Sequence, residues 1–147
     1  MVCADPSPAI LSQLPRDDRP IAVRASAEEV AGGRAALPAE RYDAMLVKKV
    51  LHHVADVGAV ISGLARLLRP GGRMLVVMLP LRITYPLFDV ALAEFARHQP
   101  DPSGIADAMR AAGLDASLSH ESFPLAFPCR AVPADGAQPL HVTAIGV

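Results

Sequence analysis

The sequence of 147 residues has no tryptophan, only six other aromatic residues and just two cysteines. Its 14 basic residues are balanced by 15 acidic ones, so it has neither the aromatic platforms nor the excess positive charge typical of nucleic-acid-binding domains. Cys3 and Cys129 stand alone, without the spacing of a structural metal site. We therefore expect no nucleic-acid partner, no bound metal and a reducing, cytoplasmic environment.

Long hydrophobic runs are also absent. The longest one, Met74 to Leu81, contains Pro80 and is far shorter than the roughly 20 residues of a membrane-spanning helix. The N-terminus shows no charged segment leading into an apolar stretch, as a signal peptide would. We expect no membrane association, and the length is enough for a single domain over residues 1–147 with a core of its own.

The most informative stretch runs from Tyr42 to Pro80 and reads YDAMLVKKVLHHVADVGAVISGLARLLRPGGRMLVVMLP. It opens with an apolar run of strand length at 44–47. Asp56 can then cap a helix, because its carboxylate can accept hydrogen bonds from the free N–H groups of the first turn. Apolar residues follow at helical spacing, which predicts one buried stripe: Val57, Val60, Ile61, Leu64 and Leu68.

The end of this predicted helix is marked by Arg66 and Arg69, whose positive charge suits the last turn, and by the breakers Pro70-Gly71-Gly72. Residues 74–79 form a second continuous apolar run, which is typical of a strand buried on both faces. Two such strands joined by a helix should be parallel, with a right-handed crossover.

These residues carry a resemblance to a known family. YDAMLVKKVLHHV followed by LARLLRPGGRMLVV resembles the fourth strand, the next helix and the fifth strand of class I S-adenosylmethionine-dependent methyltransferases, in particular the small-molecule group often called type 11. The resemblance implies an α/β, Rossmann-like three-layer sandwich with a mostly parallel sheet. It also implies S-adenosylmethionine as cofactor and methyl transfer to a small-molecule acceptor. It covers about residues 1–123 and leaves 124–147 unassigned.

The same resemblance assigns the cofactor-binding residues. The segment VCADPSP corresponds to the end of the family's second strand, so Asp5 would accept hydrogen bonds from the ribose hydroxyls, unless it only begins a turn. After a third strand at 21–25, Ala27 and Glu28 would lie near the adenine ring, although Glu28 could equally be a solvated acid. Val47 and Lys48, just past the fourth strand, would face the cofactor and the methyl acceptor.

His52 and His53 invite a catalytic or metal-binding interpretation. Adjacent helical side chains point about 100° apart, so two neighbouring histidines rarely share one ion, and we expect no metal site here. His53 remains a weak catalytic candidate, with structural packing as the main alternative. Methyl transfer by in-line displacement depends mainly on positioning.

Further along, a helix from Pro86 should carry an apolar face that includes Phe88 and Phe95, and the resemblance makes these and Tyr85 pocket candidates. Asp101-Pro102 should begin another helix that ends at Gly113. Strands are expected at 116–123 and, antiparallel, at 140–145.

The family's glycine-rich loop, which follows its first strand, has no counterpart here. The chain therefore lacks the strand that normally lies between the second and the fourth strands. Those two strands could pair directly, a partner chain such as a second copy in a homodimer could fill the gap, or the chain could be a poorly folding fragment. We expect impaired methyl transfer; the alternative is a non-catalytic, degenerate methyltransferase that acts as a binding or dimerisation module.

Overall fold

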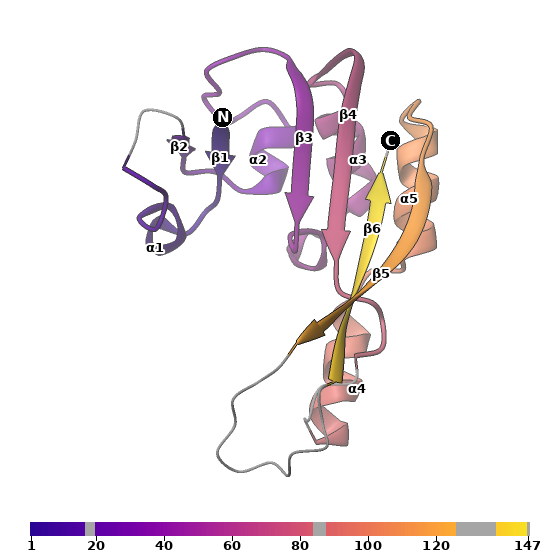
Figure 1. Cartoon of the computed structure of the whole chain (residues 1–147). Coiled ribbons are helices and arrows are strands. Elements are labelled where there is room, and N and C mark those ends of the chain that lie inside the picture. Colours follow the sequence, from indigo (N-terminus) through magenta and orange to yellow (C-terminus); the bar gives the residue numbers. More distant parts are fainter. Residues whose placement is uncertain (17–19, 84–87, 126–137, 147) are drawn as a thin grey trace.

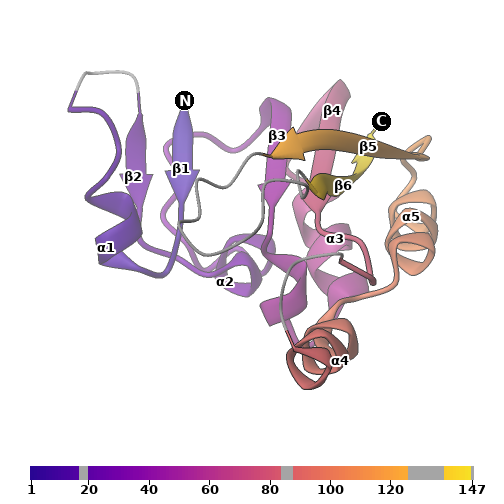
Figure 2. The same ribbon diagram turned by 60° about the horizontal axis from the view of Figure 1, so that its bottom comes forward.

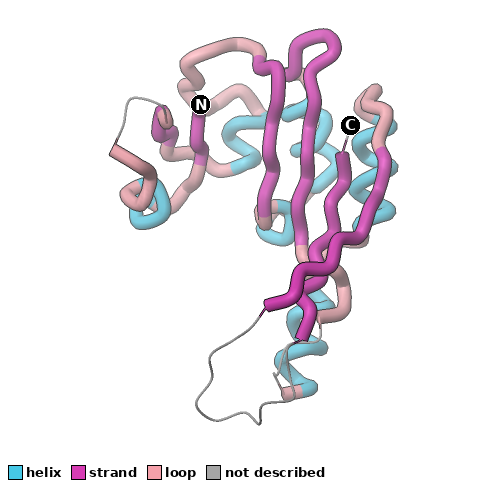
Figure 3. The backbone as a smooth tube through the Cα atoms, in the orientation of Figure 1, coloured by secondary structure: helices cyan, strands magenta, loops and turns pink. Residues whose placement is uncertain are grey.

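The strands that the structure describes form two separate sheets (Figures 1 and 3). The computed structural model describes all residues except 17–19, 84–87, 126–137 and 147. In chain order the elements are β1 (Val2–Ala4), α1 (Pro8–Leu11), β2 (Ile21–Val23), α2 (Ala27–Ala31), β3 (Tyr42–Lys48), the 3-10 helix η1 (Leu51–His53), α3 (Val57–Ala65), β4 (Leu68–Met78), α4 (Asp89–His98), α5 (Pro102–Ala111), β5 (Ser117–Leu125) and β6 (Gln138–Gly146).

The smaller sheet consists of β1 and β2, paired in parallel, and the larger has the order β3-β4-β6-β5. Among the described residues, β1 and β3 are not hydrogen-bonded to each other, so the second and fourth strands of the family pattern do not pair directly. The sheet is therefore interrupted at the position of the first strand. This arrangement confirms the α/β, Rossmann-like order of strands and helices that the sequence predicts, without a strand between β1 and β3 among the described residues.

The βαβ unit expected between Tyr42 and Pro80 is confirmed. β3 and β4 are parallel, with Met45 opposite Met74 and Val47 opposite Val76. The Asp56 carboxylate accepts from the Ala59 N–H at 2.8 Å and so caps α3. In Figure 1 α3 lies behind both strands, which makes the crossover right-handed.

The boundary between α3 and β4 differs from the prediction. The helix ends at Ala65, and Leu68 and Arg69 belong to β4 rather than to the last helical turn. The reason is sheet pairing: the Tyr42 N–H already donates to the Leu67 carbonyl at 2.8 Å, and Arg69 forms a 2.7 Å ion pair with Asp43 of β3. The Pro70-Gly71-Gly72 turn therefore interrupts the β3–β4 register instead of ending a helix.

The helices α2, α3 and α5 pack side by side on one face of the larger sheet (Figure 2). The most deeply buried side chains lie between this helical layer and β4: Ile61, Met74, Val76, Ile105 and Met109. Ile105 and Met109 of α5 are thus part of the core. Asp101 caps that helix, and Gly113 follows its end with a left-handed φ of 86°.

The last two strands are antiparallel to each other, and β6 also pairs antiparallel with β4. This confirms the strands expected at 116–123 and 140–145. The prediction of a helix from Pro86 was wrong in part. The helix α4 begins at Asp89, and its N-cap residue Phe88 is 73% exposed instead of contributing to an apolar face. Tyr85 and Pro86 lie outside the described residues.

The N-terminal elements are short, with three or four residues in each of β1, α1 and β2. Ser7 caps α1, which ends at Leu11, and the predicted strand at 21–25 is confirmed over Ile21–Val23. The helix α2 was not anticipated at this position. Ser26 and Glu29 form a reciprocal capping box, which stabilises a five-residue helix where the sequence suggested only a strand end.

Gly63 provides a test of the helical layer. A side chain at this position of α3 would fall on the carbonyl oxygen and the Cβ of Ala31 in α2. We expect Gly63→Ala to lower the free energy of unfolding by about 1–3 kcal/mol through overpacking, measured by chemical denaturation. Gly58→Ala, in the same helix, is the control. The added Cβ would lie 3.5 Å from its nearest neighbour, an ordinary contact distance, so this substitution should be neutral or stabilising. Equal effects of the two substitutions would show that α2 does not pack against α3 in this way.

Candidate cofactor site

The carboxyl ends of four parallel strands meet at one edge of the molecule. β1 and β3 point the same way in both ribbon views, and β2 and β4 are parallel to them (Figures 1 and 2). In open α/β sheets ligands bind outside the carboxyl ends of the strands. The residues that follow these four strands are therefore the candidates for binding a ligand.

Asp5 directly follows β1. Its Oδ1 accepts from the Ser7 N–H at 2.8 Å, and its own N–H continues the pairing with β2 through the Val23 carbonyl. The side chain is half-buried. Asp5 therefore does begin a turn, which is the alternative that the sequence left open, and the turn holds its carboxylate at the strand end. The second carboxylate oxygen, Oδ2, accepts no hydrogen bond within the described residues.

Ala27 and Glu28 occupy the first turn of α2, four and five residues after β2 ends. Both are half-buried. The Glu28 carbonyl accepts hydrogen bonds from Gly32 and Arg34, so its backbone is fixed while its carboxylate has no partner among the described residues. The short connection between β2 and α2 thus brings both predicted adenine-side residues to the same edge as Asp5.

Val47 and Lys48 are the last two residues of β3, and they differ in exposure. Val47 is buried against the helical layer, whereas Lys48 is exposed at the strand end. The next residue, Lys49, has a left-handed φ of 52°, which is uncommon for a residue with a side chain. Its N–H donates to the Val77 carbonyl at 2.9 Å, and this bond holds the unusual backbone turn against β4.

The rings of the two histidines contact each other in a tilted arrangement, with centroids 3.8 Å apart and an interplanar angle of 44°. His52 is half-buried, whereas His53 is exposed and contacts His52, so His53 is not a core side chain. The reason is that η1 is one short 3-10 turn, which buries Leu51 and directs the ring of His53 outward. Burial lowers the pKa of His52, and the nearby His53 and Lys49 lower that pKa further.

A small hollow opens between the ends of β3 and β4. It encloses only about 10 Å³, enough for a single water, and its walls include Lys49, His52 and Gln99. A second, wider hollow of about 300 Å³ lies between Arg82, the start of α5 and His120 of β5. Only the tertiary structure places Gln99 and His120 near the strand ends, because neither follows a parallel strand in sequence.

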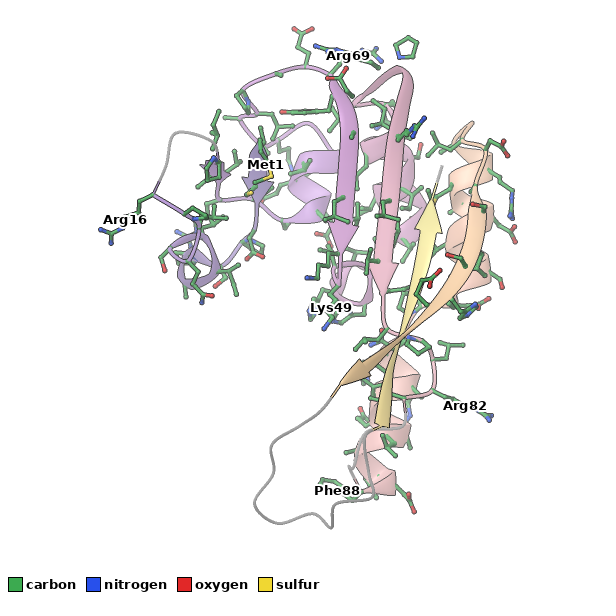
Figure 4. The ribbon with its side chains drawn as sticks, in the orientation of Figure 1. Met1, Arg16, Lys49, Arg69, Arg82 and Phe88 are labelled. Carbon is green, nitrogen blue, oxygen red and sulfur yellow. The ribbon has the colours of Figure 1, made fainter. Side chains whose placement is uncertain are left out.

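Lys49 lies at the carboxyl end of the β3–β4 pair, whereas the Arg69–Asp43 ion pair lies at the opposite end (Figure 4). Lys48 and Lys49 form no ion pair with any residue in the described part of the chain. Within the same part, no cluster of three His, Cys, Asp or Glu residues could hold a metal ion. None of the described helices has the length and apolar character to cross a membrane.

Comparison with known proteins agrees with this geometry. The family model described as a methyltransferase domain matches residues 1–76, more than half of the 147 residues. The chain belongs to the methyltransferase domain family. Its resemblance to class I S-adenosylmethionine-dependent methyltransferases is thereby confirmed.

Curated and solved relatives match parts of this methyltransferase-family chain. A ubiquinone biosynthesis O-methyltransferase of Bradyrhizobium sp. (strain ORS 278) is 49% identical over 39 residues, which are 26% of this chain and 15% of that protein. An Anabaena variabilis protein described as a methyltransferase of an antibiotic biosynthesis pathway superposes with a TM-score of 0.68. The identity is 15%, and the match covers 84% of this chain and 49% of that one.

A third relative carries a product of the cofactor. It is a phosphoethanolamine N-methyltransferase 2 of Haemonchus contortus in complex with phosphomonomethylethanolamine and S-adenosylhomocysteine. The TM-score is 0.54 and the identity 16%, over 71% of this chain and 24% of that one. The present chain therefore spans half or less of the length of these relatives, and at these identities the solved structures establish the fold alone.

The lowered pKa of His52 predicts a pH dependence of stability. Because the unfolded chain binds a proton at His52 more readily than the folded chain, the free energy of unfolding should fall as the pH drops below about 7 through the ordinary histidine pKa of about 6.5. We expect His52→Gln to flatten this slope, measured by urea denaturation between pH 7.5 and 5.5. An unchanged slope would show that His52 is not buried as described.

Proposed function

We propose that this chain binds the adenosine part of S-adenosylmethionine at the carboxyl edge of its strands and supports methyl transfer to a small molecule. Asp5 accepts hydrogen bonds from the ribose hydroxyls, since a carboxylate can hold both hydroxyls of a cis-diol, as in dinucleotide-binding folds. Ala27 and Glu28 contact the adenine ring. Val47 and Lys48 line the cofactor on the side of β3.

The observation that supports this proposal is the common edge. Asp5, the first turn of α2 and Lys48 come from three segments that are far apart in sequence, yet all follow parallel strands that end together. Their side chains also differ suitably. Among the described residues the carboxylates of Asp5 and Glu28 have no cationic partner, which suits hydroxyl and amino groups, and Lys48 and Lys49 have no anionic partner, which suits an electron-rich acceptor.

The acceptor would lie beyond β3 and β4. Its candidate location is the wider hollow near Arg82 and His120, whose roughly 300 Å³ is at the lower end of the range for small-molecule sites. Methyl transfer requires mainly that the acceptor atom be aligned with the methyl group. His53, exposed beside His52, is available as a base where the acceptor has to lose a proton, but the geometry does not require that role.

The absence of a glycine-rich loop leads to a proposal about the strength of cofactor binding and to one alternative function. Without a glycine-rich loop the chain has no backbone cradle for the methionine end of the cofactor. We therefore propose that the isolated chain binds S-adenosylmethionine weakly and transfers methyl groups slowly. A chain that forms stable assemblies and shows no cofactor binding at all would instead be a binding module.

Asp5→Asn tests the ribose contact. The amide oxygen can still accept from Ser7 and preserve the turn, while the charge that binds the hydroxyls is lost. We expect the affinity for S-adenosylhomocysteine, measured by isothermal titration calorimetry, to fall about tenfold or more, because hydrogen bonds to charged groups contribute roughly 1.5–3 kcal/mol. Wild-type binding should itself be weaker than micromolar.

Asp43→Asn is the matched control, because Asp43 lies at the other end of β3 in an exposed ion pair. It should leave the affinity unchanged. Equal affinities for the wild type and Asp5→Asn would remove Asp5 from the site, and micromolar affinity of the wild type would show that the glycine-rich loop is dispensable.

A further inference from the structure

Four basic side chains lie within six residues at the carboxyl end of β3: Lys48, Lys49, His52 and His53. All are exposed except His52, which is half-buried. None of the four forms an ion pair with an acidic residue in the part of the chain that the structure describes. Asp56, the next acidic residue in sequence, is engaged as the cap of α3. The positive charge of this cluster therefore has no partner of opposite sign among the described residues.

The backbone brings these side chains together. Lys49 lies at the end of β3 with a left-handed φ of 52°, which its hydrogen bond to the Val77 carbonyl maintains (Figure 4). In the short helix η1 that follows, the rings of His52 and His53 contact each other. Burial lowers the pKa of His52, and the positive charges of His53 and Lys49 lower it further, so the three groups are close enough to interact. Strained backbone of this kind is concentrated at functional sites.

The cluster borders the hollows at the carboxyl ends of the strands. Lys49 and His52 form part of the wall of the small hollow, and Pro100 forms another part. The next residue, Asp101, lines the wider hollow of about 300 Å³, so consecutive residues line the two hollows. The Asp101 carboxylate would repel an acidic group in the wider hollow. An acidic small molecule would therefore place its body there and its charged group at Lys49 and His52.

The charge of the proposed cofactor gives a reason for such an arrangement. S-adenosylmethionine carries a positive sulfonium at its reacting centre, and the proposed function, on which this inference rests, brings the cofactor to the end of β3. Lysines beside a sulfonium repel it, whereas an anion between them attracts both. An acidic acceptor would thus strengthen the binding of the methyl donor.

We propose that Lys49, His52 and His53 form an anion subsite for the acidic group of the methyl acceptor, which is therefore a small organic acid. The chemistry that the subsite recognises is an oxyanion, either a carboxylate or a phosphate monoester. Lys49 supplies a permanent positive charge, and each imidazole ring supplies at least one N–H donor. Lys48, at the end of the same strand, adds to the attraction.

Benzoate and phenyl phosphate test this subsite on the whole ¹⁵N-labelled chain without any cofactor. Benzyl alcohol, which has a similar ring and no charge, is the neutral probe. In NMR titrations at constant ionic strength, we expect both anions to bind about tenfold or more tightly than benzyl alcohol, because hydrogen bonds between charged groups are the stronger ones. The largest amide shifts should fall within residues 48–53, and the anion that binds more tightly identifies the class of acid.

Lys49→Gln should weaken the binding of both anions about tenfold, and Lys49→Arg, which restores the charge, should recover most of the affinity. Arg73→Gln is the matched control, because it removes an exposed cation of β4 opposite Ala44, near the other end of β3. It should leave both affinities unchanged. Glutamine keeps the backbone N–H and Cβ of residue 49, so this variant should unfold at the same temperature as the wild type.

A calorimetric measurement tests the link to methyl transfer. Benzoate should raise the affinity for S-adenosylmethionine more than the affinity for S-adenosylhomocysteine, because only the first carries the sulfonium charge. If neither compound binds, with or without benzoate, the proposed function fails, while anion binding within residues 48–53 would still establish the subsite.

Three results would overturn the proposal. The first is equal affinity for benzyl alcohol and for the two anions. The second is an effect of Arg73→Gln as large as that of Lys49→Gln, which would show attraction to positive charge in general. The third is equal enhancement of both cofactor forms by benzoate, which would show that the bound anion does not face the sulfonium.

Discussion

The parallel pairing of β3 with β4 is the interaction on which the rest of this structure depends. It places Val47 and Val76 under the helical layer, and it provides the Val77 carbonyl that fixes the backbone of Lys49. Because the pair is parallel, both strands end at one edge, and the crossover helix α3 is confined to one face. The helices α2 and α5 then pack on α3, so the core is built outward from this unit.

In the part of the chain that the structure describes, the edges of β1 and β3 that face each other have no strand partner, and their backbone polar groups need another hydrogen-bond partner. Backbone polar groups are costly when buried without partners, so the interruption can persist only where water or another chain reaches it. The same interruption separates Asp5 and Glu28 from Lys48.

Much of the local structure could be predicted because it depends on neighbouring residues. Asp56 and Asp101 cap their helices, and Gly113 ends α5, as the local sequence indicates. The boundary at Leu68 and Arg69 could not be predicted, because it depends on the distant residue Tyr42. The Tyr42 N–H donates a hydrogen bond to the Leu67 carbonyl and so pairs this segment with β3. The exposure of His53 likewise follows from the packing of Leu51 and not from the histidine pair itself.

The sequence alone determined the family pattern, the βαβ unit and the residues that follow each strand, because these depend on spacing, capping and apolar periodicity within short windows. It also showed that the glycine-rich loop is absent. Only the tertiary structure decided that β1 and β3 do not pair with each other among the described residues and that Leu46 and Leu75 are exposed. Strand order, and the contacts of Gln99 and His120, depend on which distant segments pack together, and no short window of sequence contains that information.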